Sequence, residues 1–92
     1  MEIENILANL KPELFSKFYV DKIGYFGSFS ENKQNENSDI DILVHFKKPI
    51  GWEFFDLQEL LEKELKRKID LVSINALKKQ LRDIITKQVK YV

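Results

Sequence analysis

The chain contains 92 residues, of which 43% are hydrophobic and 33% are charged. At this length surface-to-volume scaling leaves room for one modest core, so we expect a single domain over residues 1–92. Without cysteine, and with His45 as its single histidine, the chain cannot build a disulfide, a thiolate metal site or a histidine-rich zinc site. A bound metal would be held mostly by oxygen, which points to a hard cation such as Mg²⁺.

The formal net charge is zero, which argues against a general nucleic-acid binder. The charges are nevertheless divided, because residues 1–65 contain 7 Lys/Arg and 13 Asp/Glu, whereas residues 66–92 contain 8 and 2. One interpretation is a basic C-terminal helix that packs beside the acidic remainder and solvates its outer face. The other is a basic surface that faces nucleotide phosphates or an acidic partner.

The first segment, "MEIENILANLKPELF", carries acids rather than a basic leader, and no window of the chain approaches the apolar length of a membrane span. We therefore expect a cytoplasmic protein.

Apolar residues recur at helical spacing from the N-terminus to Phe18, and Pro12 interrupts this pattern. This pattern predicts one broken helix or two short ones.

The middle of the chain predicts two strands around a polar segment. "KIGYF" (22–26) is a short strand, and "SENKQNEN" (30–37) is polar and typical of turns. "DIDILVHF" (39–46) is the second strand, and "KKPIG" (47–51) ends it.

The last part of the chain predicts helix, strand and helix. Apolar residues from Trp52 to Leu65 mark a helix with one apolar side, and "KIDLV" (68–72) is a third strand. A closing helix begins near Asn75 and continues to Val89, with Ser73 or Asn75 as its cap. The order predicts an α/β, or α+β, domain with a small mixed sheet of three to four strands flanked by helices.

Two carboxylates stand inside the second strand. Because side chains alternate along a strand, Asp39 and Asp41 project from one face, roughly 6 to 7 Å apart, while Ile40, Ile42 and Val44 turn to the other. Like charges this close raise each other's pKa, and a divalent cation between them relieves the repulsion.

A third acid, Asp70, interrupts the apolar strand "KIDLV", where an unpaired carboxylate normally calls for a cation or a partner. Taken singly, Asp39 or Asp70 can be a turn or cap residue. Asp41 is harder to explain structurally, because it lies within a strand. An EF-hand at "NENSDID" is rejected, since it lacks the mid-loop glycine and the downstream glutamate. The three acids together suggest one shared site.

A Gly-Ser pair, Gly27 and Ser28, follows the first strand and would let backbone amides approach a phosphate. Gly27 precedes Asp39 by 12 positions (39 − 27), and Asp-x-Asp and an apolar strand follow. The segments "FGS", "SDIDILV" and "KIDLV" in this order resemble the nucleotidyltransferase superfamily signature. The resemblance is closest to the minimal nucleotidyltransferase (MNT) branch, and it covers nearly the whole chain.

This resemblance implies a nucleotidyltransferase fold and roles for the three acids. Asp39 and Asp41 would bind two Mg²⁺ ions, with Mn²⁺ as an alternative. Asp70 would be the third carboxylate and would orient or deprotonate the attacking hydroxyl. Metal-assisted alignment of nucleophile and leaving pyrophosphate then supplies most of the catalysis.

The nucleotide would be held by Gly27, Ser28 and Ser38. Family members commonly carry an arginine shortly after the Gly-Ser pair, whereas this chain reads "GSFSEN". Either Lys33 replaces that cation, Glu31 faces solvent, or nucleotide binding is weak.

Within the MNT branch, the resemblance implies an antitoxin that transfers AMP from ATP to a tyrosine of a HEPN-family RNase toxin. The alternative is a binding module that neutralises the toxin by occupying its surface. We expect no membrane and no direct nucleic-acid partner, and an apolar helix surface could serve a homodimer or a hetero-oligomer.

Three further sites carry weaker signals. His45 is interpreted as an ordinary strand-end residue. The aromatic residues Trp52, Phe54 and Phe55 are interpreted as core, with stacking on a base as the alternative. Tyr91 is either a modification target or a cover for the sheet.

Overall fold

The structure is a computed structural model that describes residues 3–27 and 39–92. Its elements are α1 (Ile3–Lys17), β1 (Val20–Phe26), β2 (Ile40–Phe46), α2 (Glu53–Leu65), β3 (Ile69–Ser73), the 3-10 helix η1 (Ile74–Ala76), α3 (Lys79–Gln88) and β4 (Lys90–Tyr91). Ser28, Lys33 and Ser38, which the sequence assigns to nucleotide binding, lie outside the described residues.

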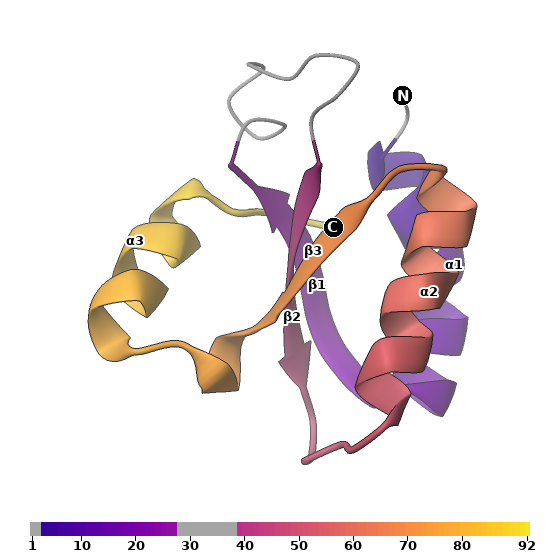
Figure 1. Cartoon of the computed structure of the whole chain (residues 1–92), viewed down its shortest axis with the longest axis horizontal. Helices are drawn as coiled ribbons and strands as arrows, with labels where there is room; N and C mark the ends of the chain where they lie inside the picture. The colour runs from indigo at the N-terminus through magenta and orange to yellow at the C-terminus, as the bar shows by residue number, and fades with distance from the viewer. Residues whose placement is uncertain (1–2, 28–38) are drawn as a thin grey trace.

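The four strands form one mixed sheet in the order β3-β2-β1-β4. β1 is antiparallel to both β2 and β4, whereas β2 and β3 are parallel. α1 and α2 cover one face of this sheet, and α3 lies on the other side (Figure 1). The predicted α/β class and the small mixed sheet are therefore confirmed.

The main core lies between the sheet and the helices α1 and α2. Ile40, Ile42 and Val44 of β2 are fully buried in it, as their alternation predicts. Their partners from the helices include the buried residues Leu7, Leu14, Leu57, Leu61 and Leu65. This apolar layer leaves the opposite face of β2 for Asp41, Leu43 and His45, of which only Leu43 is fully buried.

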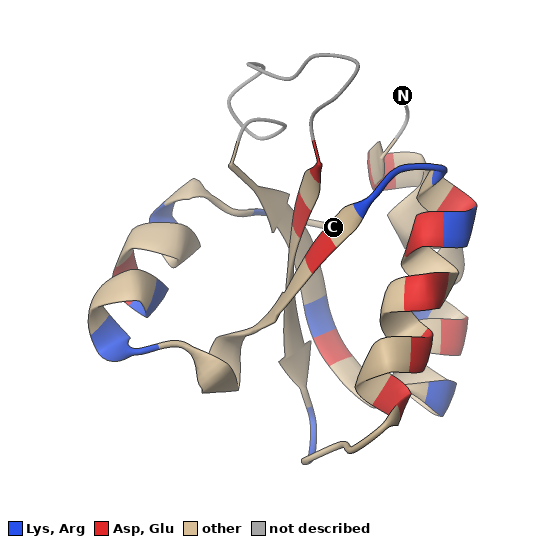
Figure 2. Ribbon diagram, in the orientation of Figure 1, with Lys and Arg blue, Asp and Glu red and all other residues tan. Residues whose placement is uncertain are grey.

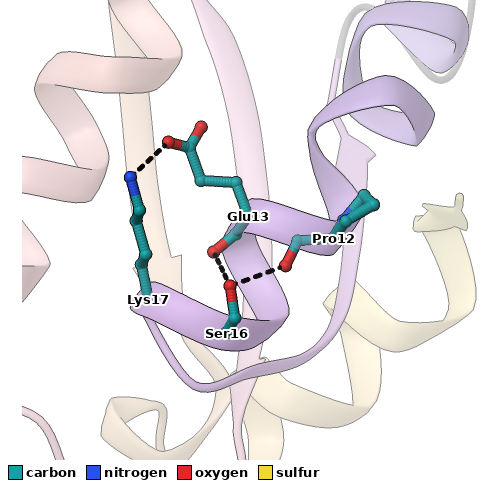
Figure 3. A network of polar contacts seen from close by, with 4 residues as sticks. All are labelled: Pro12, Glu13, Ser16 and Lys17. Carbon is teal, nitrogen blue, oxygen red and sulfur yellow. Dashed lines mark hydrogen bonds and ion pairs between the residues drawn. The ribbon is translucent and has the colours of Figure 1, made fainter.

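The predicted interruption at Pro12 is wrong, because α1 continues through it as one helix. The proline cannot donate a backbone hydrogen bond, but it lies on the exposed side, where water can satisfy the orphaned carbonyl. Ser16 Oγ donates to the carbonyl of Pro12 at 3.0 Å, and Lys17 pairs with Glu13 at 3.1 Å (Figure 3). Both contacts join residues four positions apart on the exposed side of α1, near its C-terminal end.

The end of the chain also differs from the prediction. Ser73 and Asn75 do not cap the closing helix, because η1 comes first and α3 begins at Lys79. α3 ends at Gln88, and Lys90–Tyr91 pair with β1 as the edge strand β4. A two-residue strand has too short a pattern to be recognised without its partner. Over the described ranges, none of the helices has the length and apolar character that crossing a membrane requires.

Candidate functional site

The three predicted acids gather near one end of the sheet. Asp41 on β2 and Asp70 on β3 are direct neighbours in the parallel register, so their side chains leave the same face. Asp39 lies one residue before β2 and is exposed. In Figure 2 the acidic segments of β2 and β3 appear side by side at the ends of these strands. The fold thus brings together carboxylates that are 29 positions apart in the sequence (70 − 41).

Electrostatics mark Asp41 as the centre of this group. Partial burial raises the pKa of the Asp41 carboxyl, and the nearby charges of Asp70 and then Asp39 raise it further. A side-chain hydrogen bond with Asp70 acts in the same direction. Two carboxyl groups can hydrogen-bond only when one of them carries a proton, so this contact favours the protonated form of Asp41.

Gly27 is the second feature that the site requires. It follows β1 with a φ of +70°, a left-handed conformation that side chains rarely adopt. A Cβ atom at this position would overlap the carboxylate oxygen Oδ2 of Asp41. Because Phe26 lies opposite Asp41 in the register, the turn after β1 passes directly beside the acid. The glycine therefore allows close approach of the chain to Asp41.

The donor set suits a hard divalent cation. All three predicted ligands are carboxylates, and the charges of Asp70 and Asp39 add to burial in raising the pKa of Asp41. Within residues 3–27 and 39–92, however, no three His, Cys, Asp or Glu side chains converge into a preformed metal cluster. In the described residues, Asp41 and Asp70 form a close pair, and the charge of Asp39 raises the pKa of Asp41.

The aromatic residues at the start of α2 do not belong to this site. Trp52 is 82% exposed and Phe55 is 56% exposed, so the core interpretation is wrong for both. Phe54 does pack against the core, as predicted. These residues follow the C-terminal end of β2, whereas the acids cluster at its beginning. Base stacking at the acidic site therefore has no support from their placement.

A cavity of about 540 Å³ also lies away from the acids. It is lined by mostly apolar residues from the end of β2, the loop after it, the start of α2, and β3, including Phe46, Pro49, Phe54, Leu71 and Val72. Among the residues that the structure describes, its lining contains no carboxylate that could hold a cation. The chemistry points to the acidic end of the sheet instead.

A contact between His45 and Tyr91 lies on the same face of the sheet, and no short stretch of the sequence predicts it. His45 Nε2 and the Tyr91 hydroxyl lie 2.7 Å apart, although the residues are 46 positions apart. His45 is close to the strand end, as predicted, but it is also half of a polar pair. The pair depends on β4, which the sequence analysis does not anticipate.

The chain is similar in sequence to a known family and to several named proteins. The profile of the polymerase beta, nucleotidyltransferase family matches residues 8–92. Protein adenylyltransferase MntA from Thermococcus cleftensis is 41% identical over 92 residues, which cover 99% of this chain and 93% of that protein. A Methanocaldococcus jannaschii protein, provisionally named a protein adenylyltransferase, is 45% identical over 78 residues, covering 84% of this chain and 80% of that protein.

Two solved structures share the fold. A chain in the crystal structure of a toxin-antitoxin with AMP-PNP superposes with a TM-score of 0.80 at 28% identity, covering 96% of this chain and 70% of that one. A chain provisionally described as a minimal nucleotidyltransferase gives a TM-score of 0.80 at 26% identity, covering 98% and 95%. The nucleotidyltransferase fold expected from the sequence is confirmed.

Proposed function

Because this chain belongs to the polymerase beta nucleotidyltransferase family, we propose that it transfers AMP from ATP to a protein hydroxyl and acts as an antitoxin. The acceptor in this proposal is a tyrosine of a HEPN-family toxin. The main support for the proposal is the pairing of Asp41 with Asp70 in the strand register. This pairing places two carboxylates side by side, next to the left-handed turn at Gly27.

The relatives support the choice of reaction and partner. MntA, which matches almost the whole chain, is named a protein adenylyltransferase. A structural neighbour is a toxin-antitoxin in complex with AMP-PNP, an ATP analogue. Residues 1–92 would act as a single minimal domain in the cytoplasm, without direct nucleic-acid contacts. Because so small a domain has little surface of its own for acceptor recognition, a complex with the toxin would supply it.

Enzymes of this family generally use divalent metal ions, and the acids of this chain fit that requirement. Asp39, Asp41 and Asp70 would hold two Mg²⁺ ions, with Mn²⁺ as an alternative. Bound cations supply charge neutralisation at the triphosphate and alignment of the reacting oxygens. The turn at Gly27, together with Ser28, Ser38 and Lys33, would hold the nucleotide.

The reaction releases one proton and one leaving group. The acceptor oxygen forms a bond to the α-phosphorus of ATP, the bond from that phosphorus to the bridging oxygen breaks, and pyrophosphate leaves. The acceptor proton passes to a carboxylate, and Asp70 is suited to receive it because it is exposed and adjacent to Asp41.

The alternative function is neutralisation by binding alone. The absence of an arginine in "GSFSEN" favours it, because a weaker grip on the triphosphate lowers catalysis without altering the rest of the surface. In that case the protein would neutralise its toxin partner without nucleotide or metal.

The deciding experiment is label transfer from α-³²P-ATP with Mg²⁺, using the full chain and its HEPN toxin partner. Asp41→Asn is compared with Asp56→Asn, which removes an exposed carboxylate on α2. We expect label on the toxin with the wild-type and Asp56→Asn proteins only. No label from the wild-type protein, with a stable complex still formed, would sink the enzyme proposal and leave the binding function.

A further inference from the structure

The hydroxyl of Tyr91 on β4 contacts the imidazole of His45 on β2, with 2.7 Å between the oxygen and Nε2. The two rings lie 5.4 Å apart and are tilted by 59°. β1 runs between these strands, and its Gly24 lies opposite both Tyr91 and Leu43 in the register. A Cβ atom at Gly24 would lie 2.7 Å from the carbonyl oxygen of Lys90. The missing side chain thus makes room for β4 and for the contact across the sheet.

The chain has three tyrosines, and their surroundings differ sharply. Tyr25 is buried and donates a hydrogen bond to Glu4 Oε1 at 2.5 Å, and burial is the main reason its pKa rises to about 12. Tyr19 is half-buried, with the ammonium of Lys48 3.8 Å from its ring centroid. Tyr91 is 45% exposed and places its hydroxyl against an imidazole. Of the three, it alone combines access with a neighbouring nitrogen base.

His45 is suited to act as that base. Partial burial lowers the pKa of His45, and the charge of Lys22 lowers it further, while Asp21 acts in the opposite direction. The imidazole is therefore neutral at pH 7, and in the tautomer protonated on Nδ1 its Nε2 accepts the Tyr91 O–H. Burial raises the pKa of Tyr91, so its hydroxyl stays protonated and needs a base to become nucleophilic.

We propose that Tyr91 is itself an acceptor of AMP, and that a second copy of this chain performs the transfer. This inference rests on the proposed adenylyltransferase function. The Tyr91 oxygen forms a bond to the α-phosphorus of ATP, the bond to the bridging oxygen breaks, and pyrophosphate leaves. The phenolic proton moves to His45 Nε2. The product is a phosphodiester on the exposed edge strand.

We assign the transfer to a second copy because the contact with His45 holds the Tyr91 hydroxyl away from the acids of its own chain. His45 lies four residues beyond Asp41 on β2, which corresponds to about 13 Å between their Cα atoms. Reacting atoms must approach to roughly 3 to 3.5 Å before the bond forms. While its hydroxyl contacts His45, Tyr91 is held four strand positions away from Asp41, and that exposed hydroxyl is open to the site of another molecule.

The test incubates the full chain with ATP and Mg²⁺ and maps any added AMP by intact-mass and peptide mass spectrometry. We expect one AMP on the peptide that contains Tyr91. Tyr91→Phe should remove it, and Tyr19→Phe, the matched control, should retain it. His45→Gln should slow the modification about 100-fold, within the range that a positioned base contributes. Thermal unfolding of each variant confirms that it is folded.

A mixing experiment separates donor from acceptor. Asp41→Asn protein keeps Tyr91 but lacks a key acid, and Tyr91→Phe protein keeps the acids but lacks the acceptor. We expect AMP on the Asp41→Asn copy only when the two are mixed. If wild-type protein labels its toxin partner but never its own Tyr91, this inference is overturned and the proposed function stands. If neither acceptor is labelled, both are overturned.

Discussion

The two faces of the sheet differ in what they contain. On the side of α1 and α2, the residues Ile40, Ile42 and Val44 are completely buried among leucines of both helices. On the side of α3, the same strand carries Asp41 and His45, and all ten residues of α3, each of them described, remain at least partly exposed. The face covered by α1 and α2 therefore holds most of the buried apolar core, and the other face holds the reactive groups.

The physical reason for this division is desolvation. Apolar burial stabilises by about 25 cal/mol per Å², so the leucine-rich face benefits from complete exclusion of water. A buried unpaired carboxylate costs several kcal/mol, so the acids require a face that remains open to water or a cation. The half-buried position of Asp41 lies between these limits, which is why its pKa is raised. The comparison predicts opposite responses of stability and activity on the two faces.

The largest expected effect is the loss of nucleotidyl transfer in Asp41→Asn. Removing a metal-binding carboxylate should lower the rate by at least about 1,000-fold, the equivalent of roughly 4 kcal/mol in the activation barrier. The same variant should unfold at a slightly higher temperature, because it removes like-charge repulsion with Asp70 and Asp39. Label transfer and thermal unfolding are measured on the same preparation. A clearly lower melting temperature would contradict the inference that Asp41 is repelled by Asp70 and Asp39 in the folded protein.

Next in size is the loss of stability in Leu61→Ala. Leu61 is completely buried on the helix-covered face, so its truncation should cost about 2 to 5 kcal/mol of unfolding free energy. Leu81→Ala is the matched control, because Leu81 on α3 is 50% exposed. Urea unfolding should show a change below about 1 kcal/mol for the control. Equal losses at both positions would mean that α3 supports the fold as strongly as α2.

Gly27→Ala should lower both the unfolding free energy and the rate of label transfer, each by less than the preceding substitutions do. The left-handed φ costs an L residue about 1 to 2 kcal/mol, and the new Cβ would displace the carboxylate of Asp41. We expect this loss in urea unfolding together with a fall of at least about tenfold in label transfer, since small misplacements of reacting groups cost that much or more. A variant with full activity would show that the turn does not position Asp41.

The smallest expected effect is a pH dependence of stability. The pKa of Asp41 is higher in the folded state than its ordinary 3.8, so the folded protein binds a proton more tightly than the unfolded chain. Stability from this group is present at low pH and is lost as the pH rises through the raised value. Urea unfolding as a function of pH should show a smaller decline for Asp41→Asn than for wild type.

Metal binding should reverse this trend. Adding Mg²⁺ at neutral pH should stabilise wild-type protein by favouring the charged acids, with little effect on Asp41→Asn. The measurement is the melting temperature against Mg²⁺ concentration, with K⁺ at matched ionic strength as the control. Equal stabilisation of both proteins would show that Mg²⁺ acts elsewhere.

Much of the fold was predictable because its signals are local. The strand at β2 and the placement of Ile40, Ile42 and Val44 on the core face follow from alternation alone. The interruption expected at Pro12 was wrong because propensity is a weak guide where an exposed helix side tolerates the lost hydrogen bond. The closing helix begins later than the sequence pattern predicts, because η1 and the extended residues around Leu77 precede it.

The sequence by itself determined that Ile40, Ile42 and Val44 share the core face of β2 and that Asp41 lies on the other face, because the side-chain period of a strand is two. It also determined the family, through the order of the glycine turn and the acidic strands. Only the tertiary structure decided that Asp41 and Asp70 are direct neighbours and that His45 meets Tyr91. These contacts join distant segments, and their register depends on how strands pair and how α2 crosses between β2 and β3, which no single segment encodes.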